Sequence, residues 1–191
     1  FVSKLARRKV TVALAGDGGD EVFAGYEKYS IDQLEHRWRK RVPKVIRERF
    51  FPSMAQLCRK IPLRLFGRAA TLLRALAHSP AEAFYYSNAQ IDDDEWESLA
   101  LTQTKNRLQG YHPKQITVDA YNGCDGPNHL AKILYTDLKT YLPGDILVKV
   151  DRMSMAHSLE VRAPVLDYKL VEYAARLPSS MIIQYGEKKW A

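Results

Sequence analysis

The sequence has few cysteines and no long apolar run, and each shortage excludes a class of protein. Cys58 and Cys124 are the only cysteines among 191 residues, and their spacing fits no paired metal or redox motif. We therefore expect buried, reduced thiols and no disulfide scaffold. No stretch approaches the roughly 20 apolar residues of a membrane span. The start Phe1-Val2-Ser3-Lys4 has neither an initiator Met nor a signal-peptide pattern, so a soluble cytoplasmic fragment with no membrane partner is expected.

Basic side chains are in excess, with a net charge of +7, and 46% of the residues are hydrophobic, which is typical of a globular domain. Seven of the fourteen residues from His36 to Arg49 are Arg or Lys. This stretch is the strongest argument for a nucleic-acid partner. However, Glu35 and Glu48 accompany it, Pro43 interrupts it, and it lacks the repeated aromatics of a stacking platform. We favour a solvated helical face and expect no nucleic acid. A non-catalytic domain that binds an acidic partner through this face is the alternative.

A glycine-rich acidic loop follows the clearest strand signal. The apolar run from Val10 to Ala15 predicts a buried strand, and Gly16-Asp17-Gly18-Gly19-Asp20-Glu21 comes directly after it. Apolar residues then recur at helical spacing from Val22 to Tyr29, so the loop is predicted to join a strand to a helix. In open α/β sheets, ligands bind at this edge.

The composition of the loop indicates a nucleotide bound through a metal ion. Glycines let backbone N–H groups approach phosphate closely. The carboxylates of Asp17, Asp20 and Glu21 would repel a polyphosphate unless a hard cation such as Mg²⁺ stood between them. The loop has no Gly-Lys-Ser/Thr ending, Glu21 replaces the last glycine of a dinucleotide motif, and the acids do not alternate as in an EF-hand. An acidic turn that only caps a helix is the alternative.

Most of the remaining chain is predicted to be helical. Ser79 to Glu82 is a capping box with Pro80 at the first helical position. A further helix start is expected between Asp92 and Glu95, where acidic residues suit the helix dipole. The polar stretch from Thr102 to Pro127 contains glycines and prolines and is predicted to be the most loop-like region.

The last third of the chain returns to helical patterns. Helices are expected from His129 to Leu142, from Asp145 to Glu160, and after a cap at Asp167. Only one strand, or two counting Ile182-Ile183, can be identified, which is too few for an independent sheet. The predicted fold class is therefore α/β, mostly helical, with part of the sheet absent.

A second charged group lies within the predicted helix that ends at Glu160. Lys149, Arg152 and Glu160 would share roughly one helical face, which places two cations near a carboxylate. An exposed ladder of salt bridges is the alternative.

Three long segments resemble glutamine-dependent asparagine synthetases. Residues 13–26, Ala-Leu-Ala-Gly-Asp-Gly-Gly-Asp-Glu-Val-Phe-Ala-Gly-Tyr, resemble the family's second nucleotide-site loop, and residues 141–155 resemble its downstream signature helix. Residues 159–167, Leu-Glu-Val-Arg-Ala-Pro-Val-Leu-Asp, form the third match, and residues 186–191 look like the start of a Lys-x-x-Leu-Arg motif. The resemblance spans most of the chain and is weak in its middle.

The resemblance implies a fold and a reaction. The fold would be the C-terminal part of an adenine-nucleotide α-hydrolase-like (PP-loop ATP pyrophosphatase) doubly wound domain that lacks its leading strands. The family uses ATP and Mg²⁺ to convert aspartate into an aspartyl adenylate. Ammonia, released from glutamine by an N-terminal domain, then attacks the adenylate, and the products are asparagine, AMP and pyrophosphate.

The resemblance also implies roles for individual residues. Asp20 looks like the loop's metal ligand, and Gly16, Gly18 and Asp20 are expected to bind the nucleotide. Asp17, Glu160 and Lys189 are the expected catalytic residues, with Lys189 holding phosphate and transition-state charge. Typical asparagine synthetases have Glu where this chain has Asp17, and the related β-lactam synthetases have Tyr. Amidation of another carboxylate, or a lasso-peptide or β-lactam synthetase, is the alternative within this group of enzymes.

Two motifs of the family are absent from the sequence. No segment matches the Ser-Gly-Gly-x-Asp-Ser pyrophosphatase loop, and no N-terminal nucleophilic Cys for glutamine hydrolysis is present. We therefore expect residues 1–191 to be a partial synthetase domain without the first PP-loop and the glutaminase domain. We expect this chain to make no adenylate by itself, and we expect a homodimer that forms through the open sheet edge.

Overall fold

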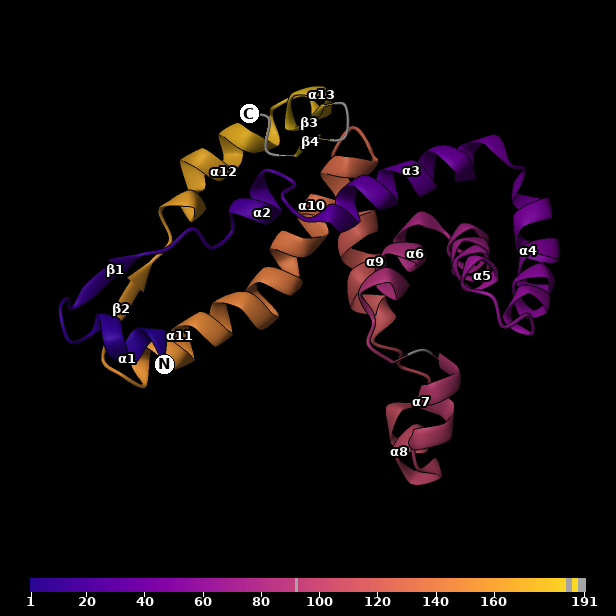
Figure 1. The fold of residues 1–191 in the computed structure, drawn as a ribbon, viewed down its shortest axis with the longest axis horizontal. Coiled ribbons are helices and arrows are strands. Elements are labelled where there is room, and N and C mark those ends of the chain that lie inside the picture. Colours follow the sequence, from indigo (N-terminus) through magenta and orange to yellow (C-terminus); the bar gives the residue numbers. More distant parts are fainter. Residues whose placement is uncertain (92, 185–186, 189–191) are drawn as a thin grey trace. The chain divides into compact units, whose positions relative to one another are not determined.

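The chain forms two compact units. A computed structural model describes residues 1–91, 93–184 and 187–188. Unit 1 comprises Phe1–Ser30 and Cys124–Ala191, and unit 2 comprises Ile31–Gly123. Most described residues are helical and the sheets are small, which confirms a mostly helical α/β chain (Figure 1).

Unit 1 contains both sheets. Strand β1 (Val12–Leu14) pairs in parallel with β2 (Glu160–Arg162), and β3 (Ile183–Gln184) pairs antiparallel with β4 (Glu187–Lys188). The α-helices of this unit are α1 (Val2–Ala6), α2 (Gly19–Val22), the beginning of α3 (Glu27–Arg41), α10 (His129–Lys139), α11 (Leu147–Met155), α12 (Tyr168–Ala175) and α13 (Ser179–Ile182). A π-helical turn, η1 (Leu142–Ile146), precedes α11, and a 3-10 turn, η2 (Pro164–Leu166), follows β2.

The strand predicted between Val10 and Ala15 is present as β1, but it is not buried. Leu14 is 74% exposed and Val12 is 38% exposed. A sheet of two strands offers too little surface for layers that would cover both of its faces. The prediction of a buried strand was therefore wrong, although its location was right.

The helix predicted from Asp145 to Glu160 ends early. Helix α11 stops at Met155, Ser158 adopts a left-handed conformation with φ 56, and Glu160 begins β2. The Glu160 N–H donates to the Thr11 carbonyl at 3.0 Å, so this residue satisfies its backbone by pairing with β1 and not within a helix. Glu160 therefore does not share a helical face with the basic residues of α11.

Unit 2 is entirely helical in its described part. It contains the remainder of α3 and six further helices, which are α4 (Lys44–Arg59), α5 (Arg64–Ala77), α6 (Pro80–Asn88), α7 (Asp93–Leu99), α8 (Thr102–Leu108) and α9 (Lys114–Gly123). The predicted capping box is confirmed, because Ser79 Oγ accepts from the Glu82 N–H at 3.3 Å and the Ser79 N–H donates to Glu82 Oε2 at 3.2 Å. The helix start near Asp93 and the Asp167 cap of α12 are also confirmed.

The stretch predicted to be a loop, Thr102 to Pro127, contains two helices. The break between α8 and α9 lies around Gln109 and Gly110, which both have positive φ. Gly123 is the last residue of α9 and does not interrupt it. The prediction failed because it weighed the number of glycines and prolines more than their positions.

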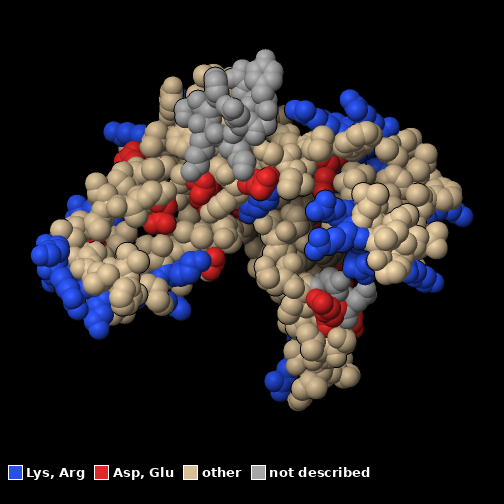
Figure 2. All heavy atoms as spheres, viewed as in Figure 1, with Lys and Arg blue, Asp and Glu red and all other residues tan. Residues whose placement is uncertain are grey.

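The basic stretch from His36 to Arg49 is only partly solvated. Five of its seven basic side chains are exposed, and basic groups gather around α3 and α4 in Figure 2. Arg39 is buried, 4% exposed, and its Nη2 donates to the Ala75 carbonyl at 2.9 Å. Arg47 donates to the Leu76 carbonyl at 2.7 Å. Both arginines therefore join helices inside unit 2.

None of the described helices is both long enough and apolar enough to cross a membrane.

Candidate functional site

The predicted glycine-acid loop lies directly at the C-terminal end of β1. The Ala15 N–H donates to the Arg162 carbonyl at 2.9 Å, and the Gly19 N–H donates to the Gly16 carbonyl at 3.2 Å. The second bond closes a turn over Asp17 and Gly18. Gly18 has φ 85 and ψ −13, the angles of the third residue of a type II turn, where glycine is favoured. The loop therefore has a defined backbone conformation.

The loop packs against the segment that follows the neighbouring strand. A Cβ atom placed on Gly18 would lie 2.1 Å from Leu166 Cδ2 and 2.6 Å from Leu166 Cγ. Leu166 belongs to η2, which comes directly after β2. The loops that follow two adjacent parallel strands thus meet at one edge of the sheet, which is where α/β sheets bind their ligands.

The helix after the loop is shorter than predicted. Helix α2 ends at Val22, Ala24 has φ 53 and is buried, and the Gly25 N–H donates to the Asp20 carbonyl at 2.9 Å. The next helix begins only at Glu27. A single turn of helix sums few peptide dipoles, so the backbone N–H groups and carboxylates of the loop determine its chemistry.

The three acidic residues of the loop have different environments. Glu21 is 1% exposed and accepts a hydrogen bond from the Tyr26 hydroxyl at 2.8 Å. Asp17 and Asp20 are partly exposed. Within the described part of the chain, no group of three or more His, Cys, Asp or Glu residues could hold a metal ion. Mg²⁺ is commonly bound by only one or two carboxylates together with phosphate oxygens and water, and Asp17 and Asp20 fit that requirement.

Glu160 lies away from this loop. It pairs with Val12, at the N-terminal end of β1, whereas Gly16 follows the C-terminal end. Its Oε1 accepts from Arg162 Nε at 2.7 Å, and both side chains are exposed. Arg162 pairs with Leu14, so it is the member of this ion pair that lies nearer to the loop.

The predicted cluster of Lys149, Arg152 and Glu160 does not form. Lys149 Nζ instead contacts Asp145 Oδ2 at 3.2 Å, four residues earlier, and both groups are exposed. This ordinary helical ion pair is the alternative that the spacing had left open. Lys189, the remaining predicted catalytic residue, lies outside the described residues.

A buried charged cluster next to the loop was not predicted from the sequence. Lys28 Nζ contacts Asp137 Oδ2 at 2.8 Å, and the Tyr29 hydroxyl donates to the same oxygen at 2.5 Å. The Lys28 ammonium also lies 4.8 to 5.3 Å from the ring centroids of Tyr26, Tyr29 and Tyr141. These cation–π contacts and the ion pair connect the start of α3 to α10 and to Tyr141, the residue before η1.

The tyrosines of this cluster are hydrogen-bond donors. Burial, together with the hydrogen bond to Glu21, raises the pKa of Tyr26 well above its usual range. Burial and the charge of Asp137 do the same to the pKa of Tyr29. Both hydroxyls therefore keep their protons and satisfy the carboxylates. An acid at position 137, between the apolar residues of α10, is the sequence signal that could have indicated this cluster.

A cavity of about 470 Å³ lies against Glu21 and Val22 of α2. Side chains of α2, α10 and α12 form most of its wall, and the buried Glu21 is one of them. Gly16, Asp17, Gly18 and Asp20 do not line it. The cavity therefore meets the glycine-acid loop only at Glu21.

Comparisons with curated proteins identify relatives along the whole chain. The chain is 29% identical over 194 residues to asparagine synthetase (glutamine-hydrolyzing) 1 of Bacillus subtilis, and 34% identical over 195 residues to a protein of Mycobacterium tuberculosis that is provisionally named as a glutamine-hydrolyzing asparagine synthetase. Each match covers 100% of this chain and 28% of the relative. The chain is also 26% identical over 194 residues to Amidase chyE of Penicillium rubens, with 92% of the chain and 27% of the relative covered.

The chain thus spans just over a quarter of the length of these relatives. No solved structure matches it significantly. A protein-family profile described as Asparagine synthase matches residues 1–191, which include β1, the glycine-acid loop, η1 and β2. The chain therefore belongs to the asparagine synthase family.

Proposed function

We propose that this chain supplies part of the ATP-dependent, amide-forming site of a glutamine-hydrolysing asparagine synthetase. The reaction would activate aspartate to an aspartyl adenylate with release of pyrophosphate. Ammonia would then displace AMP and give asparagine. The observation that carries the proposal is the Gly16–Asp20 loop, which follows β1 and is held against η2 by the close approach of Gly18 to Leu166.

The fold that we propose is a doubly wound domain of the PP-loop ATP pyrophosphatase type. In this arrangement β1 and β2 are two neighbouring parallel strands of a larger sheet, which accounts for the exposure of Leu14 in the two-stranded pair. Residues 1–191 would be one part of the synthetase domain, because the relatives are more than three times as long. The first PP-loop and the glutaminase domain that releases ammonia would belong to other parts of the enzyme.

The loop residues have separate roles in this proposal. The backbone at Gly16 and Gly18 would contact the nucleotide phosphates, because neither residue has a side chain that would keep a phosphate at a distance. Asp20 would bind Mg²⁺, with Asp17 beside it. The cation, when bound, offsets the negative charge of the phosphates and of the leaving pyrophosphate.

The three expected catalytic residues would have different roles. Asp17 would orient the attacking ammonia and accept its proton, for which it is suited as a partly exposed carboxylate in the loop. Lys189 would hold phosphate charge. Glu160 would act at a distance, through its ion pair with Arg162 at the loop end of β2.

Asp17 has one methylene fewer than the Glu of typical asparagine synthetases, so the reach of this carboxylate is shorter. The second candidate substrate is therefore a carboxylic acid other than aspartate, which the enzyme would amidate in the same way. One relative that is named as an amidase is consistent with such variation within the family.

The test is Mg²⁺-dependent ATP binding by the purified chain, measured by isothermal titration calorimetry with and without EDTA. Asp20→Ala should reduce the affinity for Mg-ATP at least tenfold. Asp119→Ala, which removes an exposed carboxylate of α9, is the matched control and should leave the affinity unchanged. Binding that is insensitive to EDTA, or equally weakened by both substitutions, would refute the assignment of Asp20.

A further inference from the structure

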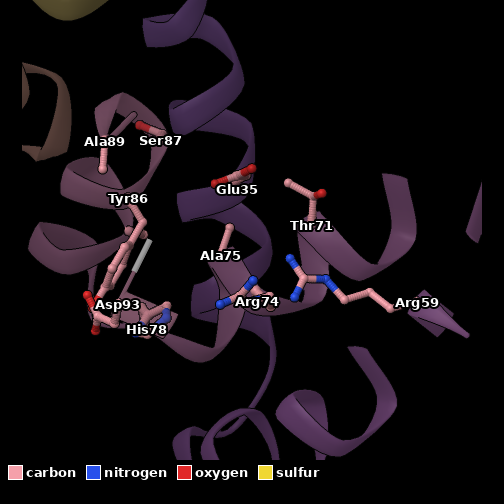
Figure 3. Close-up of a pocket in the computed structure, with 11 residues that line it drawn as sticks. Glu35, Arg59, Thr71, Arg74, Ala75, His78, Tyr86, Ser87, Ala89 and Asp93 are labelled. Carbon is pink, nitrogen blue, oxygen red and sulfur yellow. The ribbon is translucent and has the colours of Figure 1, made fainter. Parts of the chain in front are cut away.

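Unit 2 contains a cavity, lined by charged and apolar groups, that the proposed function does not use. Its volume is about 400 Å³, and side chains of α3, α4, α5 and α6 line it together with His78 and Asp93 (Figure 3). The volume lies at the lower end of the range for small-molecule sites. The cavity lies wholly within unit 2 and has no residue in common with the glycine-acid loop.

Two arginines from different helices line the cavity. Arg59 is at the end of α4 and Arg74 is in the last turns of α5, and Figure 3 shows both guanidinium groups turned toward the cavity. A second hollow, also of about 400 Å³, shares Arg59, Arg74 and His78 with the first. The two arginines therefore lie in a wall between two hollows, where a ligand can reach them.

One acidic side chain of the cavity, that of Asp93, already has partners. Asp93 accepts from the Tyr86 hydroxyl at 2.6 Å and contacts His112 Nε2 at 3.0 Å. Burial would raise the pKa of Asp93, but these two hydrogen bonds and the charge of His112 outweigh it and lower the pKa. Asp93 is therefore a stable anion that is bound to the wall of the cavity.

The other acid, Glu35, lies near a buried arginine, but its pKa is raised overall. Arg39 follows Glu35 by one turn of α3, and its charge opposes the rise in the Glu35 pKa that burial and Asp32 cause. Arg39 Nη2 holds the carbonyl of Ala75, a residue of the cavity wall, while its Nε and Nη1 have no hydrogen-bond partner in the described part of the chain. Arg59, by contrast, has neither an ion-pair nor a hydrogen-bond partner for its guanidinium among the described residues, so its charge is available to a ligand.

The side opposite the arginines is aromatic. The rings of His78 and Tyr86 lie 4.6 Å apart at an interplanar angle of 36°. Burial lowers the pKa of His78, so its imidazole is neutral at pH 7 and contributes a hydrogen-bonding group without a charge. The cavity thus combines two guanidinium groups, a neutral imidazole and an apolar ring face.

We propose that this cavity binds a small ligand that carries an oxyanion, either a phosphate or a carboxylate, through Arg59 and Arg74. The guanidinium fork presents parallel N–H donors that match the oxygens of both groups. The contact between α4 and α5 sets the spacing of the two arginines, so the site requires no residue from unit 1.

The test uses inorganic phosphate and succinate as separate probes in calorimetric titrations of the purified chain at constant ionic strength. Arg59→Gln and Arg74→Gln should each weaken binding at least tenfold. Arg68→Gln, an exposed arginine of α5 that does not line the cavity, should change the affinity less than twofold. Arg74→Lys keeps the charge but loses the fork, and it should also weaken binding.

The two probes distinguish the source of the oxyanion. Saturable binding of phosphate alone supports a phosphorylated ligand, and saturable binding of succinate alone supports a carboxylate. Arg59 is exposed, so Arg59→Gln should retain the circular dichroism spectrum of the native chain and remain interpretable if Arg74→Gln unfolds. The absence of saturable binding for both probes would overturn the proposal, as would an equal loss in Arg68→Gln. Asp20→Ala should have no effect, so this result is independent of the nucleotide site.

Discussion

Replacing Gly18 with alanine should destabilise unit 1 for two separate reasons. Gly18 has φ 85, and a side chain in this left-handed region costs about 1–2 kcal/mol. The new Cβ would also lie 2.1 Å from Leu166 Cδ2 and 2.6 Å from Leu166 Cγ. Rotation about χ2 moves the methyl groups of Leu166 but not its Cγ, so relief of both contacts requires a new χ1 or a shift of η2, and such overpacking costs about 1–3 kcal/mol. The expected loss in the free energy of unfolding is therefore about 2–5 kcal/mol.

The assay is urea unfolding followed by circular dichroism, with a double-mutant cycle. In the Gly18→Ala background, Leu166→Ala should remove the part of the stability loss that overpacking causes, while the part caused by backbone strain should persist. The effects of the two substitutions on the free energy of unfolding should therefore be non-additive by about 1–3 kcal/mol. Gly16→Ala is the matched control, because its Cβ would meet nothing within 4 Å, and it should change stability by less than about 0.5 kcal/mol. Equal effects of Gly18→Ala and Gly16→Ala would refute this account of the loop, and strict additivity with Leu166→Ala would refute the contact.

Three further predictions concern the hydrogen bonds of Asp137 and of the Ser79–Glu82 capping box. Tyr29→Phe removes a buried donor to Asp137 and should cost about 1–3 kcal/mol in urea unfolding, whereas no loss would mean that this acid is satisfied without the Tyr29 hydroxyl. Ser79→Ala should cost about 1 kcal/mol because α6 loses its cap, and an unchanged midpoint would contradict that role. Burial would raise the pKa of Glu82, but its bonds to Ser79 outweigh this and lower the pKa. Because the pKa of Glu82 is lower in the folded chain than the value of about 4.3 in the unfolded chain, this carboxylate stabilises the fold above about pH 4.3. The stabilisation is lost as the pH falls through the folded-state pKa. Stability measured from pH 6 to pH 3 should therefore decline less steeply in Ser79→Ala.

Two signals that depend only on neighbouring residues were read correctly from the sequence. The capping box at Ser79 is defined by four consecutive residues, and its bonds join only those residues. The glycine-acid loop was located correctly because a short apolar run, a glycine turn and a return to helical spacing follow one another directly. The asparagine synthase resemblance was confirmed over the whole chain for the same reason, since its motifs are contiguous.

Features that depend on distant partners were misread. Strand β2 has three residues, and it is a strand only because β1 offers it a partner far away in the sequence, so Glu160 was expected to extend a helix. Arg39 looks like any other basic residue of its stretch, and its burial is decided by its contact with Ala75 on another helix. Lys28 and Asp137 were missed because their ion pair joins two segments that are more than a hundred residues apart.

The parallel pairing of β1 and β2 also has a consequence for synthesis on the ribosome. Val12 pairs with Glu160, which is translated 148 positions later. At about 5–20 residues per second, β1 waits about 7–30 s for its partner. Unit 2 is continuous in sequence and can close during that interval. A translational pause after residues 31–123 have left the ribosome, and before Glu160 has, would therefore prolong the exposure of an unpaired strand that contains Leu14, while unit 2 could already be complete.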